Sequence, residues 1–201
     1  MRSKITVAIT FLFLVVALSS QAQQLDATFG VSGVTAPSSS DATGDHAFQT
    51  VGGGTYLGFS GDYLFFHNLG VNGEVNWRAG RNIYAVSQQP FRPIFFDFNG
   101  IWVPRVSERV QPELKAGLGV ESVRFYQPFF ICQSFFGGCT DYTSTNHFMG
   151  DFGAAVRLYV WNHVFVRPEA QVYLIHNNVE FSSGHAARFG ISIGYTFRSE
   201  Y

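Results

Sequence analysis

Alternation of apolar and polar residues recurs along this chain in stretches of about ten residues, almost to the C-terminal end. The clearest stretch runs from Leu69 to Ala79, where odd positions are apolar or small and even positions from 72 onward carry Asn, Glu, Asn and Arg. A period of two places one set of side chains on each face of a β-strand. A charged face opposite a face of Leu, Val and Trp predicts a transmembrane β-barrel with lipid outside and a polar lumen.

Eight such stretches cover the chain, and the connections between them alternate in length. Those after the second, fourth and sixth stretches are short, and those after the first, third, fifth and seventh are long. An even number of antiparallel strands closes a sheet without a free edge, as a bilayer requires. The predicted fold is therefore all-β, an eight-stranded antiparallel transmembrane up-and-down β-barrel. The expected strands cover residues 25–34, 50–65, 69–79, 93–103, 110–125, 146–160, 164–174 and 189–197.

The N-terminal segment has the organisation of a secretory signal. Basic residues precede an uncharged, mostly apolar run over residues 5–18, and Ala22 provides a small residue at the expected cleavage position. The run is shorter than the roughly 20 residues that a spanning helix needs, which makes a retained membrane anchor the weaker alternative. We expect residues 1–22 to be a signal peptide and residues 23–201 to be the outer-membrane β-barrel.

Composition favours the membrane over a soluble alternative. The chain has 13 Lys and Arg against 14 Asp and Glu, and without a basic patch we expect no nucleic-acid partner. Once the signal is removed, Lys115 is the only lysine. Phe is abundant, and aromatic residues favour strands and membrane interfaces. A soluble lipocalin-like ligand-binding barrel would bury its apolar face and expose more lysine and glutamate, and it stays as the second alternative.

The polar faces of the strands carry acidic and basic residues in nearly balanced numbers. An eight-stranded barrel is only wide enough for side chains to fill it, and unpaired buried charges are costly. We therefore expect a lumen plugged by ion pairs, in which Arg78 and Asp97 form one pair. The alternative is a narrow porin-like channel for small solutes, in which the same charges set ion selectivity. The predicted lumen charge network is Glu74, Arg78, Asp97, Glu113, Lys115, Glu121, Asp151, Arg157, Arg167, Glu169 and Arg188.

The two cysteines, Cys132 and Cys139, fall in the expected long loop over residues 126–145. In an exported protein this pair predicts a disulfide, with a free or metal-binding thiol pair as the alternative. Exposed apolar clusters often mark interaction sites, so we expect an interaction patch beside the cysteines. The alternative is that its rings fold onto the barrel rim or enter the outer leaflet. The patch consists of Phe129, Phe130, Ile131, Phe135 and Phe136.

Two runs, Pro-Glu-Leu-Lys-Ala-Gly-Leu-Gly-Val at 112–120 and Phe-Gly-Ile-Ser-Ile-Gly-Tyr-Thr-Phe at 189–197, alternate most regularly. With the signal and the eight strands, they make the chain resemble the small outer-membrane barrels of the OmpA/OmpX type, as the barrel domain without a periplasmic domain. The resemblance implies the bacterial outer membrane as location. It further implies a structural or adhesive surface-interaction role through extracellular loops.

The resemblance also implies partners. These are outer-membrane lipid, the barrel assembly machinery and extracellular ligands held by the loops, with the protein itself a monomer. In this family a last strand that ends in an aromatic residue resembles the assembly signal, which assigns that role to Tyr195, Phe197 and Tyr201.

Catalysis is not expected. Some barrels that resemble this one act on lipid A through a Ser, His and acid arrangement, and His176, Ser182, Ser183 and His185 lie near the same rim. No serine lies adjacent to His176, however, so we expect no catalytic residues and no enzyme. His147, His176 and His185 match no metal-binding spacing, so no metal and no cofactor are expected.

Overall fold

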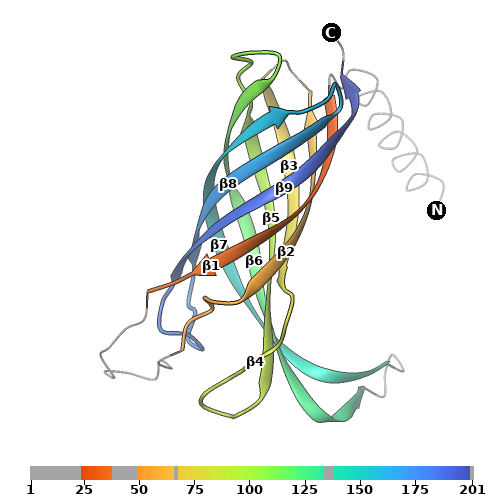
Figure 1. Cartoon of the computed structure of the whole chain (residues 1–201). Helices are drawn as coiled ribbons and strands as arrows, with labels where there is room; N and C mark the ends of the chain where they lie inside the picture. The colour runs from red at the N-terminus through yellow and green to blue at the C-terminus, as the bar shows by residue number, and fades with distance from the viewer. Residues whose placement is uncertain (1–23, 38–48, 66–67, 134–137, 200–201) are drawn as a thin grey trace, which may run out of the picture.

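The computed structural model describes residues 24–37, 49–65, 68–133 and 138–199, which form nine strands in one antiparallel sheet (Figure 1). Pairing between β3 and β5 closes the sheet into a ring, while β4 pairs only with β5 and lies outside the ring. The barrel thus has eight strands, as predicted. The strands are β1 Gln24–Thr35, β2 Thr55–Leu64, β3 Leu69–Arg78, β4 Asn82–Ile83, β5 Pro90–Trp102, β6 Val110–Gln133, β7 Gly138–Tyr159, β8 Val164–Ile175 and β9 His185–Ser199.

The two ends of the barrel differ, which confirms the predicted alternation of connection lengths. The short connections after β2, β5 and β7 lie at one end, together with the start of β1 and the end of β9 (Figure 1). We call this the turn end. The longer connections after β1, β3 and β8 lie at the opposite end, which we call the loop end, whereas β6 and β7 are separated there only by residues 134–137. Among the residues that the structure describes, no helix is long and apolar enough to cross a membrane.

The wall of the barrel has polar side chains inside and apolar side chains outside. In β3, Asn72, Glu74 and Asn76 are buried and face the lumen, while their neighbours in sequence are more exposed. On the outer wall, Phe98 is 63% exposed and Leu118 is 59% exposed. A soluble lipocalin-like barrel has the opposite arrangement, so that alternative is wrong for this chain.

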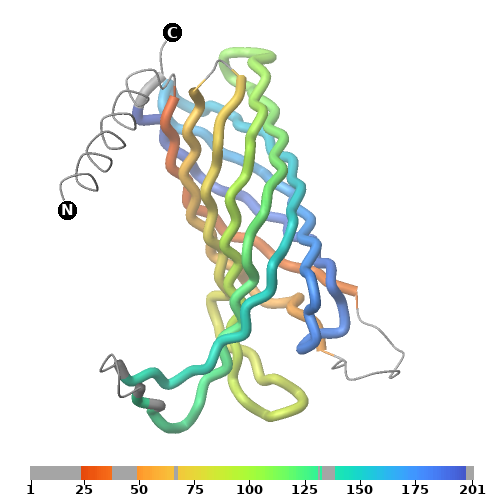
Figure 2. Tube along the Cα trace, turned by 180° about the vertical axis from the view of Figure 1, so that it is seen from behind, coloured from red at the N-terminus to blue at the C-terminus, as the bar shows by residue number. Residues whose placement is uncertain are grey.

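The prediction of a long loop over residues 126–145 is wrong, because most of this segment is paired strand. β6 and β7 continue to pair beyond the barrel as far as Gln133 and Gly138, with a register irregularity between Tyr126 and Ile131. Their paired outer parts, residues 126–133 and 138–142, form a two-stranded arm that we call the ribbon, and it leaves the barrel at the loop end (Figure 2). Strands outside a bilayer need no lipid-facing alternation, so the sequence pattern fades where the pairing continues.

Candidate functional site

Arg157 lies at the centre of the first group of charges in the lumen, towards the turn end. Its guanidinium contacts three carboxylates: it pairs with Asp26, with Asp62 at 2.9 Å and with Glu113 at 2.7 Å. Arg167 also reaches Asp62, at 3.0 Å. Each of these side chains is fully buried or nearly so. Buried charges of this kind are tolerated because each is paired and hydrogen-bonded.

A second group of charges continues towards the loop end. The Lys115 ammonium donates to Glu74 at 2.6 Å, and Arg188 pairs with Glu74 and with Glu169, the latter at 3.3 Å. Arg167 joins the two groups, since it also contacts Glu169 at 3.2 Å. We call the linked residues the lumen network: Asp26, Asp62, Glu74, Glu113, Lys115, Arg157, Arg167, Glu169 and Arg188.

Asp26 and Asp62 belong to this network although the predicted set omits them. Alternation places both on the inward faces of their strands, which is the signal that could have found them. With these two included, acidic side chains outnumber basic ones in the lumen, so the expected near balance of charge is wrong. The lumen acids are Asp26, Asp62, Glu74, Asp97, Glu113, Glu121, Asp151 and Glu169, and the bases are Arg78, Lys115, Arg157, Arg167 and Arg188.

The predicted pair of Arg78 and Asp97 is wrong. The register between β3 and β5 places Asp97 opposite Glu74, four residues along β3 from Arg78. The Arg78 guanidinium instead lies against Gly54, in the space that a side chain at this position would fill. Asp97 accepts a hydrogen bond from the Asn99 amide at 3.1 Å.

Aromatic and aliphatic side chains fill the lumen at the loop end. Phe95 and Tyr173 stack with ring centroids 4.8 Å apart. Phe181, from the connection between β8 and β9, packs on Phe91 at 5.4 Å. The sequence did not predict this cluster because its members come from seven strands and two connections. We call it the aromatic cap: Val34, Val51, Tyr56, Phe91, Phe95, Val123, Phe125, Met149, Tyr173, Ile175, Phe181 and Ala186.

Tyr84, after β4, holds the connection between β8 and β9 against the aromatic cap. Its hydroxyl donates to the Glu180 carbonyl at 2.8 Å, and its ring meets Phe181 edge-on at 6.0 Å. Burial and the nearby Glu180 carboxylate raise the pKa of the Tyr84 hydroxyl. The hydroxyl therefore stays protonated and remains a donor at neutral pH.

Glu121 and His147 lie opposite each other on β6 and β7, at the level of the aromatic cap. His147 Nε2 lies 2.8 Å from a Glu180 carboxylate oxygen. Both carboxylate oxygens of Glu121 are buried without a hydrogen-bond partner in the described part of the chain. There, no three His, Cys, Asp or Glu side chains come together as a metal site. Ser183 Oγ contacts His185 Nδ1 at 3.2 Å, a local contact between near neighbours in sequence.

The cavity bordered by Ser60, Glu74, Asn76 and Arg188 has a volume of about 10 Å³. A single water molecule needs roughly that much room. Asp151 also faces the lumen, and its carboxylate accepts a hydrogen bond from the Gln171 amide at 2.6 Å.

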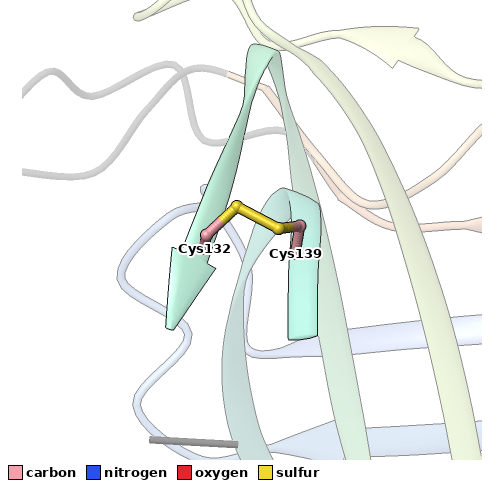
Figure 3. Close-up of a disulfide and its surroundings, with 2 residues drawn as sticks. All are labelled: Cys132 and Cys139. Carbon is pink, nitrogen blue, oxygen red and sulfur yellow. A yellow bond between two sulfur atoms is a disulfide. The ribbon is translucent and has the colours of Figure 1, made fainter. Parts of the chain in front are cut away.

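The ribbon carries the two cysteines. Cys132 and Cys139 are directly opposite in register and joined by a disulfide (Figure 3), which confirms the predicted bond. Phe129 is 61% exposed and Phe130 is 74% exposed. Phe135 and Phe136 lie outside the described residues, as do Tyr201 and the side chain of Ile131. Tyr195 and Phe197 are exposed on the outer wall of β9, with ring centroids 5.2 Å apart.

Comparison with known proteins gives a consistent family and fold. The model of a family described as outer membrane protein beta-barrel domain matches residues 8–197. Neisserial surface protein A matches at a TM-score of 0.61 with 13% identity, covering 86% of this chain and 97% of that chain. The N-terminal β-barrel domain of Pseudomonas aeruginosa OprF matches at 0.54 with 11% identity, covering 88% and 100%.

A further solved structure is Ail, the attachment invasion locus protein of Yersinia pestis, in complex with the heparin analogue sucrose octasulfate. It matches at a TM-score of 0.53 with 14% identity, covering 87% of this chain and 97% of that chain. Identities this low show a shared fold. The comparison with curated protein sequences gives no significant match.

The network predicts unequal costs for two arginine substitutions. Arg157→Ala takes one cation from three buried carboxylates and leaves Asp26 without an ion-pair partner among the described residues, so the free energy of unfolding should fall by about 3–5 kcal/mol. Arg78→Ala breaks no ion pair between described residues and should cost less than about 1 kcal/mol. Urea unfolding in phosphatidylcholine vesicles, followed by tryptophan fluorescence, measures both. Equal losses for the two variants would contradict the ion-paired network.

The disulfide predicts a local effect. Closing so short a ring stabilises a chain by about 2–3 kcal/mol in the entropy model, but here the ring lies in the ribbon, outside the barrel. The double variant C132S/C139S should therefore leave the unfolding of the barrel unchanged within about 0.5 kcal/mol and speed proteolytic cleavage of the ribbon. Limited proteolysis with mass spectrometry locates the cuts, and cuts that spread into the barrel strands would refute the local role.

Proposed function

Since this chain belongs to the outer membrane protein beta-barrel family and lies in the bacterial outer membrane, we propose that it is a closed barrel that displays the ribbon for binding. In such barrels the short turns face the periplasm and the long loops face outward. The loop end, and the ribbon with it, is therefore extracellular.

The ribbon is the observation that carries this proposal. It leaves the barrel wall as a paired two-stranded arm (Figure 2). It presents Phe129 and Phe130, both largely exposed. Exposed apolar side chains of this kind mark interaction surfaces. The disulfide between Cys132 and Cys139 fixes the arm before a partner arrives, which lowers the entropic cost of binding. A ligand-bound relative of the same fold, Ail with a heparin analogue, supports binding by barrels of this size.

The filled lumen supports a structural role for the barrel rather than transport. The lumen network occupies the middle of the barrel, the aromatic cap fills the extracellular end, and the cavity beside Glu74 and Arg188 is about 10 Å³. We propose no enzymatic activity and no cofactor for this site. The protein is proposed to act as a monomer, with Tyr195 and Phe197 on β9 presented to the assembly machinery.

The closed lumen predicts electrical silence. The detergent-refolded mature protein, inserted into a planar bilayer, should show no stepwise conductance, because ion pairs and aromatic rings fill the path. Folding is checked in parallel by β-sheet circular dichroism and protease resistance. Steady, reproducible openings from folded protein would instead establish the narrow channel and make the lumen charges its selectivity residues.

If the ribbon is the binding surface, trimming it should abolish attachment of cells that display the protein and leave the barrel folded. Tyr126 and Tyr142 are opposite in register, so an Asn-Gly turn can replace residues 127–141 and close the hairpin. Cells of a non-attaching host that display the full chain should bind surfaces coated with alkyl chains, because Phe129 and Phe130 present exposed apolar rings. Cells with the trimmed chain, or with F129S/F130S, should fall to the level of the bare host.

The matched control for this experiment is V106S. Val106 is 72% exposed in the short connection between β5 and β6, at the periplasmic end. Attachment that survives trimming of the ribbon, or that is lost equally in V106S, would contradict a binding role for the ribbon.

A further inference from the structure

Three arginines lie on the outer surface of the barrel where it leaves the membrane at the extracellular end. Arg92 on β5 and Arg124 on β6 are directly opposite in register, and Arg81, after β3, reaches the neighbouring Tyr126. We call Arg81, Arg92 and Arg124 the arginine row. Like charges directly opposite on neighbouring strands repel each other and destabilise the sheet. The arrangement therefore favours a counter-charge from outside the chain.

The chain itself does not provide that counter-charge. Within the described ranges, every ion pair uses Lys115, His147, Arg157, Arg167 or Arg188, and none uses the arginine row. One Arg92 nitrogen, Nη2, donates to the Ala79 carbonyl at 3.2 Å, but Nε is buried without a partner. Apart from this bond and the buried Nε of Arg92, the N–H groups of the three guanidinium groups are not used in hydrogen bonds between described residues.

Tyrosines hold two of these arginines in place. The Arg81 guanidinium lies 3.5 Å from the centre of the Tyr126 ring, and that of Arg124 lies 4.8 Å from the centre of the Tyr142 ring. The two tyrosines are opposite in register, with ring centroids 6.0 Å apart. Stacking of this kind orients the flat guanidinium and leaves its charge unneutralised. Its N–H edges remain available to an anion.

The height of the arginine row matches the lipid headgroups. The lipid-facing wall on these strands includes Phe96, 45% exposed, and Val120, 38% exposed. Arg92 and Arg124 lie four residues farther towards the extracellular end on the same faces of β5 and β6. Four residues of a tilted strand rise by about 10 Å. That distance leads from the apolar belt into the headgroup region of a bilayer.

We propose that the arginine row binds phosphate groups on lipid headgroups of the outer leaflet. Arginine forks match phosphate oxygens with paired N–H donors. Beside Arg81, a hollow of about 620 Å³ is lined by Gln88, Gln89 and Gln127 and by no acidic residue. These amides offer donors and acceptors to the uncharged polar part of a headgroup. The inference rests on the membrane location and is independent of the closed lumen and of binding by the ribbon.

The test uses the full mature chain, refolded in detergent micelles and titrated with the diphosphorylated glycolipid lipid A. Native mass spectrometry counts the bound lipid. The double variant R92Q/R124Q should bind lipid A about tenfold more weakly, the equivalent of losing one charge-assisted contact. The matched control R105Q/R109Q removes the same charge from the exposed periplasmic connection between β5 and β6. It should bind as the unmodified chain does.

Three further arms identify the ligand. Dephosphorylated lipid A should bind the unmodified chain as weakly as lipid A binds R92Q/R124Q, and binding of lipid A should weaken with salt. Equal binding of phosphorylated and dephosphorylated lipid, or equal loss in the control variant, would overturn the proposal. Displacement of lipid A by inorganic phosphate at equal concentration would overturn the lipid assignment in favour of a free anion. Circular dichroism and protease resistance establish that each variant is folded before it is compared.

Discussion

Closure of the sheet is the constraint on which the rest of this structure depends. A bilayer offers no hydrogen-bond partners to a strand edge, so every backbone group of the membrane-crossing strands must find a partner within the sheet. The pairing of β3 with β5 meets that demand by completing the ring. Closure with eight strands also fixes a narrow interior. Every inward side chain then lies within reach of strands that are distant in sequence.

The lumen network follows from that narrowness. Arg157 reaches Asp26 from across the barrel, 131 positions away in sequence, and one guanidinium serves carboxylates from three other strands. Such ion pairs connect the strands across the lumen, in addition to the backbone hydrogen bonds between neighbouring strands. The aromatic cap adds contacts between distant strands at the loop end, where Phe181 enters from a connection instead of a strand.

Alternation in the sequence predicted the number of strands, their faces and the closed barrel, because a period of two is a local property. What depends on register or on contacts across the barrel could not be predicted. Asp97 faces Glu74 and not Arg78 because the offset between β3 and β5 is decided by the whole ring. The aromatic cap and the partners of Asp26 exist only once distant strands meet. The ribbon was missed because pairing outside lipid leaves no alternating pattern.

Arginine has two opposite environments in this barrel, and the contrast separates structure from interaction. Inside, three arginines are buried and paired with carboxylates, namely Arg157, Arg167 and Arg188. Their charge is neutralised within the chain, and the ion pairs link strands of the barrel wall. Outside, Arg81 and Arg124 stack on tyrosines, and no member of the arginine row pairs with a described carboxylate. A charge left unneutralised at the headgroup level does nothing for the folded chain alone. Its stabilising contribution begins when an anion of the surrounding leaflet binds it.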